Sequence, residues 1–242
     1  MLPLFLADSV AGETVVLLGE EARHAASVVR LRIGERIRVS DGESQCVEGI
    51  VISVAKSRVE IEVKSRFSIV PFQLKVTVAQ ALAKGDGSST AVALLTEVGV
   101  DEILPWSGRR SIAKWDGEKV VKGRERWEAV ARESSKQSRR IAIPKIGALH
   151  SIHDLVARIK SADCAIVLHE SAEEAFGNIT IPRIGEVLLI VGPEGGIDES
   201  ELEIFRAAGA HLAVLGPTVL RSSHAGSIGA ALVISGRWYA RK

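Results

Sequence analysis

The sequence contains very little cysteine and no long apolar run. Its two cysteines, Cys46 and Cys164, lie far apart and form no CxxC pair, which argues against a disulfide framework or a zinc site and favours a reducing cytoplasm. The longest apolar runs have the length of strands and are far short of a bilayer span. Residues 1–10 lack the charged start of a signal peptide. With 46% hydrophobic and 25% charged residues, the 242-residue chain has the composition of one large folded domain or two smaller ones.

Charge is nearly balanced overall but unevenly distributed. The formal net charge is +1, yet residues 109–140 hold eleven Lys or Arg against five acids, and residues 170–203 hold nine acids against one Arg. A basic block of this size can be a footprint for nucleic-acid phosphates, whereas an acidic block repels them. Both blocks can also be solvated helix faces, so charge alone leaves the two interpretations open.

Residues 1–71 carry the pattern of a small β-rich domain. The spacing of apolar residues predicts one helix at 20–31 and strands at 36–40, 47–55 and 58–66, with a hairpin turn at Asp41-Gly42. Short strands joined by tight turns predict a small barrel, and Pro71 marks the crossing into the next domain.

From residue 72 onward, apolar strands alternate with helices. We expect strands at 74–82, 102–106, 164–170, 186–192 and 211–216, a helix that begins at an N-cap of Ser88 or Ser89, and a second helix at 122–139. This alternation predicts an α/β domain over residues 72–242, with a mainly parallel sheet covered on both faces. Ligands of such sheets bind beyond the carboxyl ends of the strands. If the strands are neighbours, residues 168–170, 192–196 and 215–221 meet at one rim.

The turn "GPEGG" at residues 192–196 does not fit a phosphate-binding loop. It has neither the spacing of a P-loop nor its lysine, and it is not GxGxxG. Asp198 and Glu201 have the spacing of a capping box, which places acids at the helix N-terminus that a phosphate would use. The loop therefore suits a neutral or cationic ligand, while the alternative is that Gly195 and Gly196 only turn a strand into a helix.

The tandem "LLIVGPEGGIDESE" and "LGPTVLR" closely resembles the SPOUT superfamily of methyltransferases, and within it the 16S ribosomal RNA uracil-N3 methyltransferase family. "HAASVVRLRIGERIRVSDG" resembles that family's N-terminal PUA-like RNA-binding domain. "LLTEVGVDEILPWSGRRS" and "RWEAVARESSKQSRRIAIPKI" resemble parts of its catalytic domain. The resemblance covers nearly the whole chain in the same order.

The resemblance implies a deep trefoil knot in the C-terminal domain, a homodimer, and S-adenosylmethionine held by three loops. The cofactor-binding residues that it implies are Leu168, His169, Glu170, Gly192, Pro193, Glu194, Gly195, Gly196, Leu215, Gly216, Pro217, Val219 and Leu220. The sulfonium of this cofactor is cationic, so nearby carboxylates are tolerated. No metal is implied.

Three residues after the third loop are the catalytic candidates. Arg221 can steady a uracil oxygen while the N3 proton leaves, although it can also be a helix-start arginine bonded locally. The family usually has a sequence close to "RTETA" here, whereas this chain has "RSSHA". Ser223 therefore replaces a glutamate, and His224 can act as the base or simply cap the helix or face solvent.

RNA contact is expected from residues in both domains, although each one alone can be an ordinary surface charge. The candidates are Arg23, His24, Arg30, Arg32, Lys84, Arg110, Gln137 and Arg140. The first hypothesis for function is N3-methylation of one uridine in the decoding region of 16S rRNA in the small ribosomal subunit. The second is a non-catalytic RNA-binding or ribosome-assembly protein that retains the fold, and the third is the same chemistry on another RNA. Each predicts a cytoplasmic protein without membrane contact.

Overall fold

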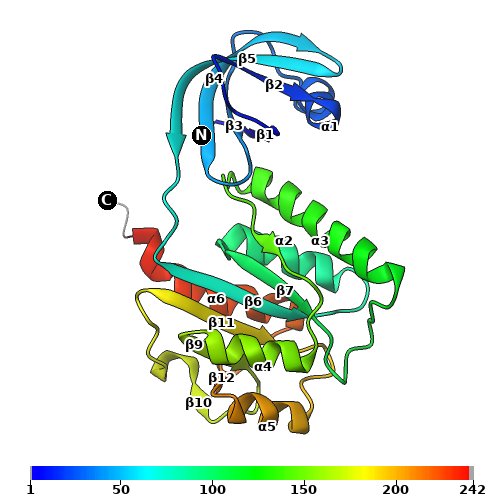
Figure 1. Cartoon of the computed structure of the whole chain (residues 1–242), viewed down its shortest axis with the longest axis vertical. Coiled ribbons are helices and arrows are strands. Elements are labelled where there is room, and N and C mark those ends of the chain that lie inside the picture. The colour runs from blue at the N-terminus through cyan, green and yellow to red at the C-terminus, as the bar shows by residue number, and fades with distance from the viewer. Residues whose placement is uncertain (1, 240–242) are drawn as a thin grey trace. The chain divides into compact units, whose positions relative to one another are not determined.

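The computed structural model describes residues 2–239, which divide into two compact units (Figure 1). The first unit comprises Met1–Pro71 together with Arg132–Ile143, and the second comprises Phe72–Ala131 together with Pro144–Lys242.

A five-stranded sheet forms the first unit. Its strands are β1 (Leu4–Leu6), β2 (Thr14–Leu18), β3 (Arg36–Ser40), β4 (Gln45–Ala55) and β5 (Arg58–Ser68), in the spatial order β1-β3-β4-β5-β2. Phe5 from one edge strand and Leu17 from the other belong to a single buried cluster with Ile37 of β3, so the sheet curls around one core. The predicted hairpin turn joins β3 to β4, where the Asp41 carboxylate accepts three backbone hydrogen bonds from residues 43–45.

The helix predicted at residues 20–31 is shorter and less regular than expected. α1 (Gly19–Arg23) continues directly as η1, a π-helix over His24–Val29, and Arg30 ends it with a left-handed φ of 60°. The backbone N–H groups of Arg30 and Leu31 both reach the carbonyl of Ala25. Ala25 within the π-helix and Leu31, which follows the left-handed Arg30, are both buried in the core of the first unit.

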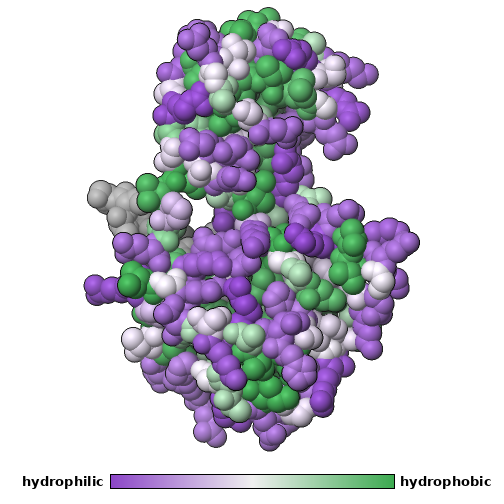
Figure 2. All heavy atoms as spheres, viewed as in Figure 1, coloured by the Kyte–Doolittle hydropathy of each residue, from purple (hydrophilic) through white to green (hydrophobic). Residues whose placement is uncertain are grey.

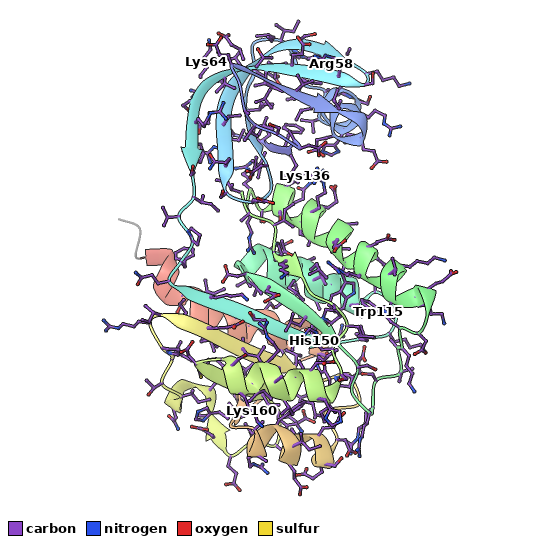
Figure 3. All side chains as sticks on the ribbon, in the orientation of Figure 1. Arg58, Lys64, Trp115, Lys136, His150 and Lys160 are labelled. Atoms are coloured by element: carbon purple, nitrogen blue, oxygen red, sulfur yellow. The ribbon has the colours of Figure 1, made fainter. Side chains whose placement is uncertain are left out.

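The last turn of α3 (Glu118–Gln137) and the residues after it pack in the first unit. Lys136, labelled in Figure 3, forms a buried ion pair with Glu21 at 3.1 Å. Ser40 Oγ donates to the carbonyl of Ile141 at 2.9 Å, and the backbone N–H of Ile143 donates to the carbonyl of Gly42 at 2.8 Å. Residues 132–143, which include the end of α3, thus belong to the first unit.

A seven-stranded sheet forms the centre of the second unit, and its ladders are all parallel. The strands are β6 (Leu74–Ala81), β7 (Glu102–Trp106), β8 (Lys145–Ile146), β9 (Cys164–Leu168), β10 (Glu174–Ala175), β11 (Gly185–Val191) and β12 (His211–Val214), in the order β10-β12-β9-β11-β6-β7-β8. The predicted mainly parallel sheet is confirmed. β9 lies between β11 and β12, so the three strands expected to share a rim are neighbours.

Helices cover both faces of this sheet: α2 (Gly87–Val98), α4 (Ile152–Ser161), α5 (Glu199–Ala207) and α6 (Ser222–Tyr239), with the short 3-10 helix η2 (Phe176–Asn178). Successive residues of β11 face opposite sides. Leu188 and Ile190 share a buried cluster with residues of α4 and α5, whereas Leu189 packs against Gly229 of α6. Figure 1 shows α4 in front of the sheet and α6 behind it.

The N-cap prediction for α2 is wrong. The helix begins at Gly87 with Asp86 as its N-cap, two residues before the N-cap position of Ser88. The hydroxyl of Ser88 is engaged elsewhere, because it accepts from the backbone N–H of Ala83 and donates to the carbonyl of the same residue.

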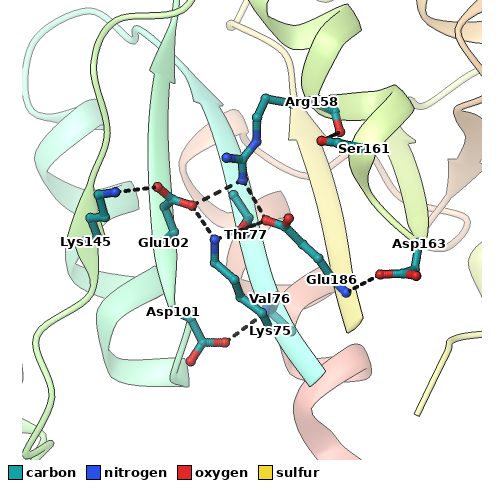
Figure 4. A network of polar contacts seen from close by, with 10 residues as sticks. All are labelled: Lys75, Val76, Thr77, Asp101, Glu102, Lys145, Arg158, Ser161, Asp163 and Glu186. Carbon is teal, nitrogen blue, oxygen red and sulfur yellow. Dashed lines mark hydrogen bonds and ion pairs between the residues drawn. The ribbon is translucent and has the colours of Figure 1, made fainter. Parts of the chain in front are cut away.

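An ion-pair network occupies the opposite end of the sheet from the predicted rim (Figure 4). The buried Glu102 carboxylate lies 2.6 Å from Lys75 Nζ and 3.2 Å from Arg158 Nη2, and Lys145 lies 3.7 Å away. Burial raises the pKa of Glu102, but the hydrogen bond from Lys75 and the charges of the neighbouring cations outweigh it. The pKa of this carboxyl therefore lies below its ordinary value.

Among residues 2–239, no helix is long and apolar enough to cross a membrane. No three His, Cys, Asp or Glu side chains in the described part of the chain are grouped so that they could hold a metal ion. On the face drawn in Figure 2, hydrophobic residues form several separate patches among hydrophilic ones.

Candidate functional site

A cavity of about 550 Å³ opens in the second unit where β9, β11 and β12 end. Three segments that are distant in sequence form its walls: residues 168–170, 191–197 and 214–225, with Gly87 of α2. Parallel strands end at the same edge of a sheet, so the loops that follow them meet there. The structure thus brings together the three segments that the sequence placed at one rim.

Most of the residues predicted to hold the cofactor line this cavity. They are Leu168, His169, Glu170, Gly192, Pro193, Glu194, Gly196, Leu215, Val219 and Leu220. Gly195, Gly216 and Pro217 belong to the same loops but are not among the lining residues. Thr218, inside the third predicted loop, also lines it, whereas sequence reasoning missed Gly87, Val191, Ile197, Val214, Ser222 and Ala225. Val191 and Val214 end strands β11 and β12, so strand ends were the signal that could have found them.

The loop at residues 192–196 is tightly packed, and its glycines are used in different ways. Gly196 has a φ of +74°, and its N–H donates to the carbonyl of Pro193 at 2.9 Å, which makes the turn. A Cβ on Gly192 would lie 2.6 Å from Cγ1 of the buried Ile197, so no side chain fits there. A Cβ on Gly195 would approach the backbone oxygen of Arg110 to 3.3 Å. The loop can therefore present backbone groups to a ligand without side chains in the way.

Carboxylates beside this loop are already engaged. The capping box predicted for Asp198 and Glu201 is confirmed. Hydrogen bonds from the side chain and backbone of Ser200 lower the pKa of Asp198, so this carboxyl stays ionised near the loop. Glu194 lines the cavity, and its Oε1 accepts from the backbone N–H of Lys84 at 3.1 Å. Negative charge at the start of α5 opposes phosphate binding.

The catalytic candidates lie at the start of α6. Arg221 and Ser223 line the cavity, while His224 is exposed and lies outside the lining. Ser223 Oγ is 2.9 Å from His224 Nδ1, so the hydroxyl at the cavity wall connects to an imidazole in contact with solvent. Ser222 Oγ instead donates to the carbonyl of Gly192 at 2.5 Å.

The residues predicted to contact RNA are distributed over both units. Arg23, His24, Arg30, Arg32, Gln137 and Arg140 lie in the first unit, and Lys84 and Arg110 lie in the second. All are exposed except His24 and Arg140, which are half-buried. Arg23 pairs with Glu20 at 3.7 Å. Arg110 is bound to the segment between β11 and α5, because its guanidinium lies 3.2 Å from Asp198 Oδ2 and 3.5 Å from the carbonyl of Gly195.

Three tryptophans belong to the packing of the second unit. Trp106 and Trp127 are buried, and Trp106 Nε1 donates to the carbonyl of Val191 at 2.9 Å, beside the cavity. Trp115, labelled in Figure 3, meets Trp127 edge to face with ring centroids 5.3 Å apart. These contacts are typical of aromatic residues that stabilise a hydrophobic core.

Two family models match the chain in the order of its units. Residues 17–64 match an RNA methyltransferase PUA domain, and residues 70–234 match an RNA methyltransferase domain. The chain is 40% identical over 243 residues to ribosomal RNA small subunit methyltransferase E of Mycobacterium bovis, covering 97% of this chain and 93% of that protein. It is 33% identical to the protein of the same name from Bacillus subtilis, covering 88% and 86%.

Solved structures have the same fold. A ribosomal RNA small subunit methyltransferase E from Neisseria gonorrhoeae, crystallised with S-adenosyl methionine, superposes with a TM-score of 0.87 at 24% identity, covering 97% of this chain and 98% of that one. The matches in sequence span both units, and the match in fold spans nearly the full length. The chain therefore belongs to the family of the ribosomal RNA small subunit methyltransferases E, with an RNA methyltransferase domain and that family's PUA domain.

Proposed function

We propose that this protein transfers the methyl group of S-adenosylmethionine to N3 of one uridine in the decoding region of 16S rRNA in the small ribosomal subunit. The observation that carries the proposal is the convergence of the three predicted cofactor segments on one cavity, in a chain of this family. The M. bovis and B. subtilis relatives are named for action on small-subunit ribosomal RNA. Uridine N3 as the acceptor rests on the resemblance of the sequence motifs.

The chemistry of the cavity suits this cofactor. Its volume of about 550 Å³ is in the range of small-molecule sites. The charged residues in its lining are Glu170, Glu194 and Arg221, a balance that favours a cation over a nucleotide phosphate. Apolar walls from Leu168, Ile197 and Leu215 suit an adenine ring, and the backbone of residues 192–196 and 215–220 would hold its polar edge and the ribose. When bound, S-adenosylmethionine supplies an electrophilic methyl group.

The residues at the start of α6 would act on the uracil. Arg221 would stabilise the negative charge that develops on a uracil oxygen as N3 loses its proton. Ser223 Oγ would accept the N3 proton while donating its own to His224 Nδ1, which lies 2.9 Å away. His224 is exposed and would release that proton to water. In the whole reaction the bond between sulfur and the methyl carbon would break, the bond between N3 and that carbon would form, and one proton would leave to solvent.

Residues of both units would contact the RNA. We propose residues 1–71 as an RNA-binding domain and residues 72–242 as the catalytic domain, with the eight arginine, lysine, histidine and glutamine candidates as contacts. The homodimer is proposed on the resemblance, supported by Ile228 and Leu232, apolar residues that lie on one side of α6 and are 39% and 51% exposed. The trefoil knot and the cytoplasmic location stay predictions from the resemblance and the composition.

Labelled S-adenosylmethionine tests the proposal directly. Purified protein should transfer methyl label to small ribosomal subunits that lack the modification. Arg221→Ala and His224→Gln should lower the rate without abolishing cofactor binding, whereas His153→Gln, on the exposed side of α4, should not. No transfer to small subunits with transfer to another RNA would establish the third hypothesis. No transfer to any RNA, with cofactor and RNA both bound, would establish the non-catalytic binder.

A further inference from the structure

Gln80 is a fully buried amide at the edge of the cofactor cavity. It is the second-last residue of β6, opposite Val191 in β11 and Pro105 in β7, and it does not line the cavity. Burying an amide costs free energy unless its groups are used. Here the amide nitrogen lies 3.2 Å from Ser222 Oγ and 3.5 Å from the carbonyl of Ser222.

The direction of these hydrogen bonds is fixed by chemistry. Ser222 Oγ has one proton and lies 2.5 Å from the carbonyl of Gly192, which can only accept, so the hydroxyl donates there. It must therefore accept from Gln80, and only the amide nitrogen can donate. A continuous chain results, from Gln80 Nε2 through Ser222 Oγ to the carbonyl of Gly192.

This chain joins three segments that meet only in the folded protein. Gln80 belongs to β6, Gly192 begins the cofactor loop after β11, and Ser222 begins α6. Ser222 also stands between Arg221 and Ser223, so holding it fixes the backbone that carries both. Other contacts hold α6 close: a Cβ on Gly226 would lie 3.3 Å from Gln80 Oε1 and 3.1 Å from Val191 Cγ2, closer than most side chains tolerate.

The other end of the amide has no compensating contact. Gln80 Oε1 is buried and makes no hydrogen bond with any residue that the structure describes. Buried acceptors of this kind are rare, and a methionine would fill the same space without the cost. The amide nitrogen is therefore the functional end of this side chain.

From these contacts we infer that Gln80 is a positioning residue for methyl transfer, which acts through Ser222 to hold Arg221 and Ser223 against the cofactor loop. The inference rests on the proposed function for its catalytic consequence. Its structural part, that Gln80 holds the start of α6, stands independently of turnover. In the absence of the amide, the first turn of α6 loses its connection to β6, and the reacting groups lose their alignment.

Gln80→Met tests the inference, because it keeps the volume and removes the donor. The kcat for methyl transfer should fall about 100-fold, as expected for a misplacement of about 1 Å, while the KM for RNA changes less than about threefold. Thr96→Val is the matched control, since it removes a buried hydroxyl from α2 that donates to the carbonyl of Val92. Its kcat should stay within about threefold of the unchanged protein.

Ser222 provides a second and independent variant. Ser222→Ala should reproduce the loss, Ser222→Thr should recover most of it, and the double variant with Gln80→Met should be no slower than either single variant. Losses that multiply in the double variant, or a Gln80→Met protein with nearly unchanged kcat, would overturn the inference. If Gln80→Met does not fold, the comparison of Ser222→Ala with Ser222→Thr decides, because a Thr variant as slow as the Ala variant excludes a role for the hydroxyl.

Amide hydrogen exchange separates this inference from the proposed function. The N–H groups of His224 and Ala225 donate to the carbonyl of Arg221 at 2.8 and 3.0 Å, so they report on the first turn of α6. Their exchange should accelerate at least about tenfold in Gln80→Met and stay unchanged in Thr96→Val. Unchanged exchange in Gln80→Met would overturn the inference even if the protein is active. Accelerated exchange in a protein that methylates no RNA would contradict only the proposed function.

Discussion

Replacing Glu102 by glutamine removes the central anion of the network in Figure 4. Its side chain is 6% exposed and lies within 4 Å of three cations. Removing one partner of a buried pair typically costs about 3–5 kcal/mol, because a charge is left buried and unpaired. Here the cost is smaller, because Lys75 and Arg158 remain paired with the Glu186 carboxylate at 3.3 and 2.6 Å. The side chain of Lys145 is mostly exposed to water. We expect Glu102→Gln to lower the free energy of unfolding by about 2–3 kcal/mol.

Urea unfolding followed by tryptophan fluorescence measures this change in the second unit alone. All four tryptophans, at positions 106, 115, 127 and 238, lie in sequence outside the first unit. Glu118→Gln is the control, because Glu118 forms an exposed i,i+4 pair with Lys122 and should change stability by less than about 0.5 kcal/mol.

The pH dependence of the free energy of unfolding shows whether the ionised form of Glu102 is the stabilising one. The pKa of Glu102 is lowered in the folded protein, so its stabilisation is present above the ordinary glutamate pKa and is lost as pH falls through the folded value. The difference between the unchanged protein and Glu102→Gln should therefore shrink between about pH 6 and pH 3. The reasoning would be refuted if the difference in free energy of unfolding were as large at about pH 3 as at neutral pH. A difference below about 0.5 kcal/mol at neutral pH would also refute it.

Three further predictions follow from particular residues. Gly192→Ala should weaken S-adenosylmethionine binding by more than about tenfold in calorimetry, because its Cβ has no space, whereas Gly177→Ala, with nothing within 4 Å of its Cβ, should bind normally. Burial raises the pKa of Cys46 to about 11, so its thiol should resist alkylation at pH 8 in the native protein and react in urea; rapid native labelling would contradict this burial. Arg30→Ala and Arg32→Ala should each weaken RNA binding and reduce the slope of log affinity against log salt by about 1, and an unchanged slope would remove that residue from the RNA contacts.

The regular parts of the fold could be predicted because they depend on local patterns. Alternation in residues 58–66 and the apolar run at 186–192 predicted β5 and β11, and the spacing of Asp198 and Glu201 predicted the capping box. Strands that alternate with helices form parallel sheets, so the meeting of the three cofactor segments also followed.

Features that depend on tertiary contacts could not be predicted. The π-helix at His24–Val29 lies against the core through Ala25, and the spacing of apolar residues alone gives no sign of its wider turn. Residues 132–143 join the first unit through Lys136 and Glu21, which are more than a hundred positions apart. Gln80 looks like an ordinary polar residue in a strand until Ser222 is placed beside it.

Reverse transcription of methylated small-subunit RNA is the measurement that tests the central claim most directly. A methyl group on N3 blocks base pairing, so the reverse transcriptase should stop at a single uridine in the decoding region of 16S rRNA, only when the protein and S-adenosylmethionine are both present. The same stop should be weak or absent with Arg221→Ala. Label that enters the RNA without such a stop would contradict N3-methylation, and a stop elsewhere would contradict the proposed target.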